Sequence, residues 1–331
     1  MILSPKSAIK HRLTYIVDGG DILDNKKVIV ANTRDDSLTI IDLLNRAKTE
    51  TLDLKESILC SGYMKMHNIY LGPYELEDDR QGNLYCTNVY DNSILKIDLN
   101  ERRVVDIVAV GKNPTCIKYF ENNLFIANSD SNSISIIDVG GFTLTENIQV
   151  GGKPIDIEID EKARKVYIAS YYGQSIEVID LISHDKTSIK IKNNPVKMII
   201  EDNLLFILTH INNGVMDISN ISIVDIANNM EIDNTNLKGI FNDMIIISGR
   251  EIVFVTNMGN GYLYRMDIEK RDLSSKTYLS GMPNKLNWNG ENILFITNTS
   301  NNVLTLFDIN LNKVIENIKV GNEPNGIFIL K

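Results

Sequence analysis

Short apolar segments separated by small polar residues follow one another along almost the whole chain. The stretch from Val110 to Val150, VGKNPTCIKYFENNLFIANSDSNSISIIDVGGFTLTENIQV, contains four of them. The segments are rich in Ile and Val and are interrupted by Asn, Gly and Asp. This punctuation favours β-strands over helices, in which apolar residues recur every three to four positions.

The same stretch predicts a unit of four strands, which we call A to D. Asn and Gly between the strands accept the positive φ angles that tight hairpin turns require. A glycine and, three residues later, a proline mark the crossing from strand D into strand A of the next unit, as at Gly111 and Pro114. The predicted strands are Thr115–Phe120, Leu124–Ala127, Ser133–Ile137 and about Thr143–Val150.

An aspartate closes one apolar segment of every unit and reveals the repeat. Successive aspartates are separated by 56, 40, 42, 45, 42 and 41 residues. A period of this length in short strands is typical of the four-stranded blades of a β-propeller. The sequence therefore predicts an all-β, seven-bladed propeller of antiparallel blades. The seven aspartates are Asp42, Asp98, Asp138, Asp180, Asp225, Asp267 and Asp308.

Three features of the repeat together resemble the YVTN/YncE-like family of seven-bladed β-propellers. They are V-G-x-x-P, a B strand ending in Ala/Thr-Asn, and S/V-x-x-I-D, and they extend over about residues 27–331. Two blades depart from this pattern, at Ser170 and at Thr209-His210. The resemblance implies the fold and leaves the activity open, because related propellers bind, scaffold or catalyse. The Ala/Thr-Asn pairs are Ala31-Asn32, Thr87-Asn88, Ala127-Asn128, Thr256-Asn257 and Thr297-Asn298.

The chain is expected to form a single domain over residues 1–331, since no linker or composition shift divides it. Residues 1–26 form an N-terminal extension or an extra strand, and residues 55–74 form an insertion between blades one and two. The inner strand of blade one comes either from Leu13–Val17 or from Gly326–Leu330. We favour the second, which pairs the N- and C-terminal strands, because Pro324 otherwise begins a strand without a blade.

Composition limits the classes of partner. The 331 residues carry a net charge of -9, and their pI is about 5.1. An acidic surface argues against nucleic acid, whose phosphates require clustered Lys and Arg. No apolar stretch is long enough for a transmembrane segment or a signal peptide. Three cysteines without metal-type spacing favour a reducing compartment. We expect a cytoplasmic protein without a cofactor, the alternative being a cell or spore surface; the oligomeric state stays open.

The residue two positions after each crossing proline, or its equivalent, defines a ring at the mouth of the central channel. Charges in strands that otherwise pack between blades suggest side chains pointing into a solvated channel. Glu75, Asp156, Lys197, Asp243 and Lys285 are therefore candidate ligand-binding residues; alternatively they pair with one another and with water. The full ring is Glu75, Cys116, Asp156, Lys197, Asp243, Lys285 and Gly326.

A second candidate site is aromatic. Rigid strands that present aromatic and polar groups suit recognition of a protein, a peptide or a small polar ligand. The alternative is that these side chains are solvated loop residues. The candidates, all on B–C hairpins or D–A crossings, are Tyr74, Tyr90, Tyr171, Tyr172 and His210.

No catalytic motif stands out, so the sequence favours a non-catalytic binding or scaffold propeller. Its ligand-binding face would consist of the B–C hairpins and D–A crossings, which lie on one side of such a ring. The alternative is a metal-dependent, lactonase-like hydrolase at the channel mouth. Propeller lactonases resemble this fold and use a divalent cation held by oxygen ligands, which implies Glu75, Asp156 and Asp243 as the metal ligands here.

Overall fold

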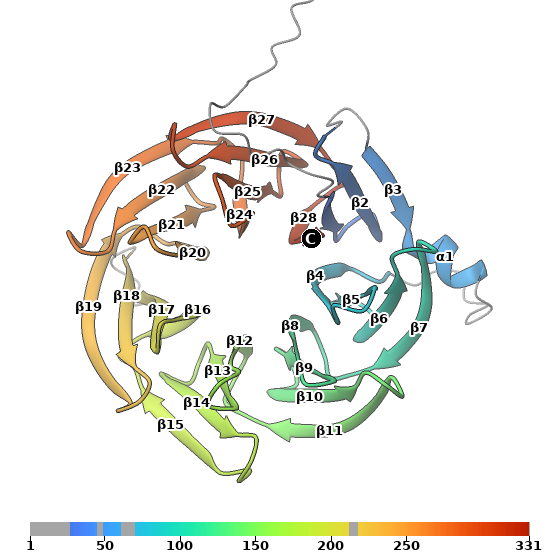
Figure 1. Cartoon of the computed structure of the whole chain (residues 1–331), viewed down its shortest axis with the longest axis horizontal. Helices are drawn as coiled ribbons and strands as arrows, with labels where there is room; N and C mark the ends of the chain where they lie inside the picture. Colours follow the sequence, from blue (N-terminus) through green and yellow to red (C-terminus); the bar gives the residue numbers. More distant parts are fainter. Residues whose placement is uncertain (1–26, 45–48, 61–69, 212–217, 331) are drawn as a thin grey trace, which may run out of the picture.

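A computed structural model describes residues 27–44, 49–60, 70–211 and 218–330. In it, seven four-stranded antiparallel sheets stand around a central channel (Figure 1). This confirms the predicted seven-bladed β-propeller. Blade 1 consists of β28 Pro324–Leu330, β1 Lys27–Asn32, β2 Ser37–Asp42 and β3 Thr49–Asp53. Blade 2 consists of β4 Pro73–Asp78, β5 Asn83–Asn88, β6 Ser93–Asp98 and β7 Arg103–Ala109. Blade 3 consists of β8 Pro114–Phe120, β9 Asn123–Asn128, β10 Ser133–Asp138 and β11 Thr143–Gln149.

The remaining blades repeat the same order, with the first strand innermost and the fourth outermost (Figure 1). Blades 4 to 7 consist of β12 Pro154–Asp160, β13 Lys165–Ser170, β14 Ser175–Asp180 and β15 Lys186–Lys190; β16 Asn194–Glu201, β17 Leu204–Ile211, β18 Ile218–Asp225 and β19 Met230–Lys238; β20 Asp243–Ile247, β21 Ile252–Asn257, β22 Tyr262–Asp267 and β23 Asp272–Tyr278; and β24 Pro283–Trp288, β25 Ile293–Asn298, β26 Val303–Asp308 and β27 Lys313–Lys319.

The core lies between the blades. The second strand of each blade is apolar and buried on both faces, as in β9, NLFIAN. Seven hydrophobic clusters result, each of which joins two neighbouring blades, and together they close the ring. A blade cannot bury its two faces alone, so the whole ring is needed for stability.

The repeat aspartates cap the turns between the third and fourth strands. Asp138 accepts hydrogen bonds from the Gly141 N–H at 2.6 Å and from Asn122 Nδ2 at 2.9 Å. Asp308 likewise accepts from two main-chain N–H groups of its own turn. These hydrogen bonds hold the turns in place, so the most regular residue of the repeat has a structural role.

At two crossings, a buried asparagine occupies the space where a side chain on the glycine would be. A Cβ on Gly111 would lie 2.6 Å from the Asn128 side chain, and one on Gly321 would lie 2.6 Å from that of Asn32. The family-like Gly and Asn positions are therefore one packing unit, in which the backbone of the crossing approaches the end of the B strand.

The ring closes as favoured above. Strand β28 pairs antiparallel with β1, with Val28 opposite Ile329 and Val30 opposite Ile327. The alternative strand, Leu13–Val17, lies outside the described residues, as does the whole extension 1–26.

The insertion between blades 1 and 2 begins with a helix that the strand pattern did not predict. Helix α1, Leu54–Cys60, lies beside β7 at the outer edge of the ring (Figure 1). The Ser57 hydroxyl on this helix accepts a 2.7 Å hydrogen bond from the Val104 N–H on β7. Residues 61–69 of the insertion are outside the described part of the chain. No helix of the described part is long and apolar enough to cross a membrane.

Candidate functional site: the channel mouth and the hairpin–crossing face

Main-chain hydrogen bonds join the B–C hairpin to the crossing that enters its own blade in blades 1, 2, 3, 4 and 7. In blade 6 the Met258 N–H of the hairpin donates to the Asn242 side chain of the crossing at 2.9 Å. The Ser129 N–H donates to the Asn113 carbonyl at 2.9 Å, and the Tyr171 N–H donates to the Lys153 carbonyl at 2.8 Å. Side chains link the blades in turn, since the Ser129 hydroxyl donates to the Pro154 carbonyl of the next blade at 2.7 Å. Hairpins and crossings thus form one stiff surface around the channel, which we call the hairpin–crossing face.

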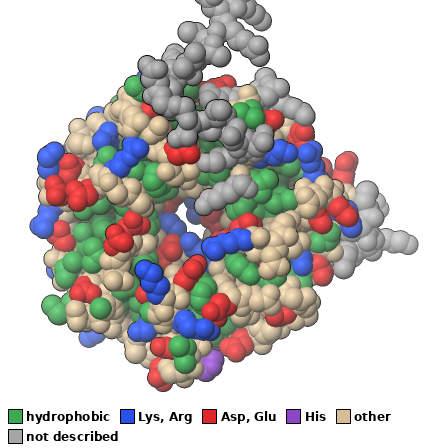
Figure 2. Space-filling model, viewed as in Figure 1, with side chains coloured by type: hydrophobic (Ala, Val, Ile, Leu, Met, Phe, Trp, Pro, Cys, Tyr) green, Lys and Arg blue, Asp and Glu red, His purple; other side chains and the backbone are tan. Residues whose placement is uncertain are grey.

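The innermost strands line a central opening. The space-filling view shows basic and acidic side chains around this hollow (Figure 2). Lys285 on β24 reaches over blade 1 to Glu75 on β4, where its Nζ lies 2.8 Å from Oε2. Gly326 on β28 leaves room for this arrangement: a Cβ there would lie 2.5 Å from the Tyr74 carbonyl oxygen. Blades 7, 1 and 2 therefore approach one another closely at the channel.

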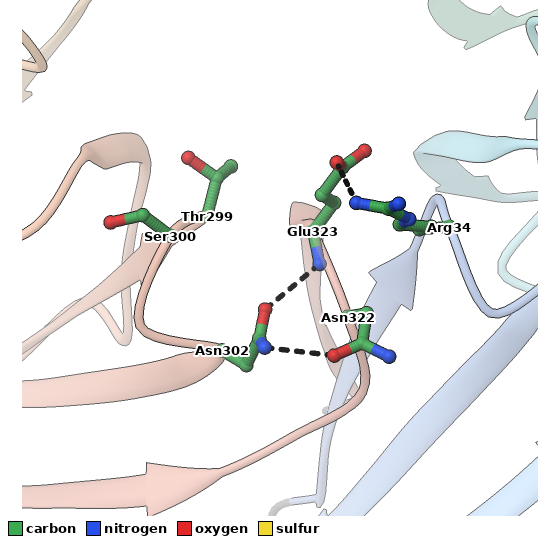
Figure 3. Close-up of a pocket in the computed structure, with 6 residues that line it drawn as sticks. All are labelled: Arg34, Thr299, Ser300, Asn302, Asn322 and Glu323. Atoms are coloured by element: carbon green, nitrogen blue, oxygen red, sulfur yellow. Dashed lines mark hydrogen bonds and ion pairs between the residues drawn. The ribbon is translucent and has the colours of Figure 1, made fainter.

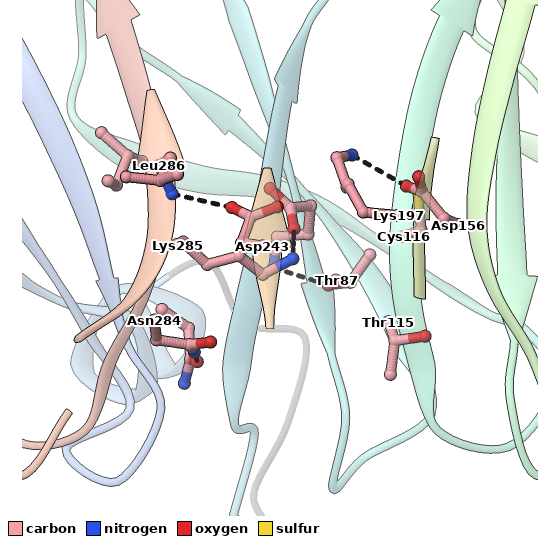
Figure 4. A network of polar contacts seen from close by, with 12 residues as sticks. Thr87, Thr115, Cys116, Asp156, Lys197, Asp243, Asn284, Lys285 and Leu286 are labelled. Carbon is pink, nitrogen blue, oxygen red and sulfur yellow. Dashed lines mark hydrogen bonds and ion pairs between the residues drawn. The ribbon is translucent and has the colours of Figure 1, made fainter. Parts of the chain in front are cut away.

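The second ion pair of the ring joins blades 4 and 5. Lys197 Nζ lies 3.0 Å from Asp156 Oδ1, and the other carboxylate oxygen accepts the Met198 N–H at 2.6 Å (Figure 4). The Cys116 thiol completes this group by donating to Asp156 Oδ1 at 3.6 Å. Burial raises the pKa of that thiol far above its usual value, so Cys116 stays protonated and is not a nucleophile.

Asp243, the third acid of the ring, is held by the backbone of the next blade. It is buried, and its Oδ2 accepts the Leu286 N–H at 2.8 Å (Figure 4). Burial raises the pKa of this carboxyl, while the charges of Lys285 and Lys197 act in the opposite direction. Asp156 and Asp243 share one contact: each accepts a main-chain N–H from the inner strand of the following blade.

A second tier of charges, two residues further along the inner strands, was missed in the sequence. Lys118 Nζ lies 3.0 Å from Glu158 Oε1, and Lys197 Nζ lies 3.9 Å from the same oxygen. Glu77 occupies the corresponding position on β4, and burial raises its pKa to about 7 despite the nearby Lys118. The signal that could have revealed this tier was the alternation of the strand itself, since i and i+2 point to the same side.

The three acids suggested as metal ligands do not meet. Glu75 and Asp156 each contact a lysine ammonium, on different sides of the channel, and Asp243 contacts the backbone of β24. Within the described residues, no group of three or more His, Cys, Asp or Glu side chains is placed to hold a metal ion. A divalent cation at this ring would have to displace an ammonium group from at least one carboxylate.

The aromatic candidates of blades 4 and 5 form a group. The rings of Tyr171 and Tyr172 meet edge-on with centroids 5.2 Å apart, and the Tyr171 and His210 centroids are 6.4 Å apart. Lys153 Nζ lies 5.6 Å and 6.0 Å from the two tyrosine ring centroids. Tyr172 is 68% exposed, whereas Tyr171 is half-buried. The cation of a crossing and the aromatic rings of the neighbouring hairpin are thus presented together.

His210 is tied to the next blade through one ring nitrogen. Its Nε2 lies 2.6 Å from the Phe241 carbonyl oxygen, which can only accept, so Nε2 carries the proton. Burial lowers the pKa of His210, which keeps the ring neutral near pH 7 and leaves Nδ1 as an acceptor. At this position the asparagine found in most other blades is missing, and blades 5 and 6 are linked through His210 instead.

The other two aromatic candidates lie elsewhere on the ring. Tyr74 is half-buried beneath Lys285, whose Nζ is 5.4 Å from the ring centroid, and burial raises the pKa of the phenol. Tyr90, 55% exposed, covers Gly72, where a Cβ would lie 2.5 Å from the tyrosine Cδ2. The structure therefore brings Tyr171, Tyr172 and His210 together and leaves Tyr74 with the channel.

A concavity on the same face marks the boundary between blades 7 and 1. It has a volume of about 490 Å³ and is polar throughout (Figure 3). Arg34 pairs with Glu323 at 3.4 Å across its edge, and Asn302 donates to Asn322 Oδ1 at 2.8 Å. Sequence reasoning did not find it, because its residues come from opposite ends of the chain. Its lining consists of Arg34, Thr299, Ser300, Asn302, Asn322 and Glu323.

The fold is shared with many solved structures. A putative 6-phosphogluconolactonase from Bacteroides fragilis matches with a TM-score of 0.72 and 12% identity over 94% of this chain and 100% of that chain. Hydrazine synthase from Kuenenia stuttgartiensis matches with a TM-score of 0.69 and 17% identity over 80% and 92%. Dihydro-heme d1 dehydrogenase matches with a TM-score of 0.64 and 14% identity over 91% and 74%. At these identities the likeness shows the β-propeller fold alone.

Neither of the other comparisons adds a relative. The sequence matches no protein-family model, and no curated protein matches it. Function must therefore be argued from the residues themselves.

Proposed function

We propose that this chain is a non-catalytic binding propeller whose hairpin–crossing face takes a protein, a peptide or a small polar ligand. The observation that carries the proposal is the exposed Tyr172 beside Tyr171 and Lys153, held by the hydrogen bonds between hairpin and crossing. Rigid presentation of aromatic rings lowers the entropy lost on binding. The V-G-x-x-P repeat supports placing the chain with the YVTN/YncE-like propellers, a resemblance that is compatible with a binding role.

The channel mouth contributes charged side chains to this face, and they are already paired with one another. Its carboxylates at Glu75 and Asp156 are each neutralised by a lysine within 3.0 Å. The ring can therefore orient a polar ligand only by exchanging one of these ion pairs for a contact to the ligand.

A peptide library displayed on phage and selected against the immobilised protein tests the proposal. We expect enriched peptides whose binding falls at least five-fold in Tyr172→Ala. The matched control is Ile182→Ala, because Ile182 is 69% exposed and lies in the turn after β14, on the opposite face. Failure to enrich any peptide, or equal loss in both variants, would refute a peptide-binding face.

The alternative function, a metal-dependent hydrolase, can be tested with the same purified protein. It requires a stoichiometric divalent ion in elemental analysis, lost on Asp156→Asn or Asp243→Asn, together with lactone hydrolysis. A metal-dependent turnover of a lactone would overturn the non-catalytic proposal.

A further inference from the structure

Charge is unevenly distributed over the hairpin–crossing face. The described hairpins and crossings of blades 4 to 6 contain Lys153 and Lys192 and no aspartate or glutamate, and Lys238 ends the adjoining strand β19. The hairpins of blades 1 to 3 and the crossings into blades 1 and 3 carry more acidic than basic residues: Asp35, Asp36, Asp91, Asp130 and Glu323 against Arg34 and Lys112. The chain as a whole has a net charge of -9, so the part of the face on blades 4 to 6 is basic although the protein is acidic.

Ring contacts and one hydrogen bond connect aromatic residues across the same three blades, partly beneath the surface. From Tyr171 and His210 the connection continues through the Phe241 carbonyl, which receives the histidine hydrogen bond. Beyond Phe241 come two tyrosines of β22 and one of β23, each within 6.0 Å of the previous ring centroid. The last, Tyr278, is 62% exposed, and a Cβ on Gly261 of the blade 6 hairpin would lie 3.1 Å from its ring. Exposed tyrosines thus stand at both ends, Tyr172 on blade 4 and Tyr278 on blade 6.

The lysines of this region are available to a ligand. Lys192 and Lys238 are exposed, and neither has a carboxylate partner among the described residues. By contrast, Arg34 on the far side of the ring already pairs with Glu323. We call this region the tyrosine–lysine sector and define it by Lys153, Tyr171, Tyr172, Lys192, Lys238 and Tyr278.

We propose that the tyrosine–lysine sector binds an acidic segment of a partner protein that also carries apolar side chains. This inference rests on the proposed binding function and names its partner class. The unpaired lysines complement Asp and Glu, and the tyrosines supply rigid contact area. Ile240 and Met282, 41% and 42% exposed, lie in the crossings into blades 6 and 7, on either side of blade 6, and suit aliphatic side chains.

A nucleic acid is the less favourable polyanion. Its affinity depends on the number of phosphates neutralised, and a few lysines on a chain of net charge -9 neutralise few of them. A short acidic peptide needs only local complementarity, because it does not extend over the acidic blades across the ring.

Fluorescence anisotropy of labelled 12-residue peptides tests the inference. The probes are a Glu/Leu/Tyr peptide, the same peptide with Gln for Glu, the same with Lys for Glu, and a single-stranded dT12 oligonucleotide. We expect the Glu peptide to bind most tightly. Its Kd should rise at least ten-fold in the double variant K192E/K238E and at least three-fold in Tyr172→Ala.

The controls are matched by exposure and charge. Lys112→Glu reverses an exposed lysine in the crossing into blade 3, and Tyr70→Ala removes a ring that is 68% exposed, like that of Tyr172. Each should change the Kd less than two-fold. Equal loss in Lys112→Glu, tighter binding of dT12, or no binding of the Glu peptide would overturn the inference. Neutral or basic peptides that bind and depend on Tyr172 would also overturn it while leaving the proposed binding function intact.

Discussion

Replacing Lys285 with methionine tests whether the channel mouth is held closed by its own ion pairs. The Lys285 and Glu75 side chains are 23% and 22% exposed, and their charged atoms are 2.8 Å apart. Removing one partner of a fully buried pair costs about 3–5 kcal/mol, because the other charge is left unpaired. With about a fifth of each side chain exposed, we expect K285M to lower the free energy of unfolding by about 2–3 kcal/mol.

The double variant E75Q/K285M separates the unpaired charge from lost packing. Since neither residue is then charged, its free energy of unfolding should return to within about 1 kcal/mol of the wild type. The control is Lys270→Met, which removes a 3.1 Å pair with Asp267 whose lysine is 77% exposed, and should cost at most about 1 kcal/mol.

Urea unfolding followed by the fluorescence of Trp288 measures all three variants. Trp288, the single tryptophan, is half-buried on β24, the strand that also bears Lys285, and donates to the Glu291 carbonyl at 3.1 Å. The pair raises the pKa of Lys285 well above its usual value, so its contribution should be constant from pH 6 to 9 and lost only as pH rises through that higher pKa. A K285M cost no larger than that of K270M would refute the reasoning.

Three further predictions concern packing and protonation. Gly326→Ala places a Cβ 2.5 Å from the Tyr74 carbonyl, so urea unfolding should show a loss of about 1–3 kcal/mol, while Gly140→Ala, with 3.4 Å of clearance, should be near neutral. Glu77 has its pKa raised to about 7, so wild-type stability should fall from pH 5 to pH 8 in pH-dependent unfolding, and Glu77→Gln should flatten that slope. Burial lowers the pKa of His210, so the free energy of unfolding should decrease as pH falls below 6.5, because the unfolded chain binds the proton more readily. This decrease should be absent in His210→Gln. Unchanged slopes in these variants would contradict the assignments.

The repeat was readable from the sequence because its determinants are local. Strand length, the polar turns and the Asp138-type cap lie within a few residues of one another, and the cap bonds the turn that follows it. The inner strand of blade 1 was also inferred correctly, because Pro324 begins a unit that lacks three strands. Helix α1 was not predicted, since seven residues carry too little periodicity to distinguish a helix from a strand.

The ring of candidate residues was likewise inferred from the position two residues after each proline. The contacts that these residues make could not be inferred in this way. Lys285 pairs with Glu75, 210 residues away, because Gly326 leaves the intervening blade without a side chain at that position. The second tier at Lys118 and Glu158 depended on the same alternation and was overlooked.

The sequence by itself determined the number of blades, their strands and the residues that recur in them, since these follow from period, turn chemistry and alternation. Only the tertiary structure decided which charges neutralise one another and which exposed tyrosines stand on the same part of the face. Those contacts join residues on different blades, and their distances depend on how the ring closes. That is why the fold could be inferred from one unit, while the binding face required all seven.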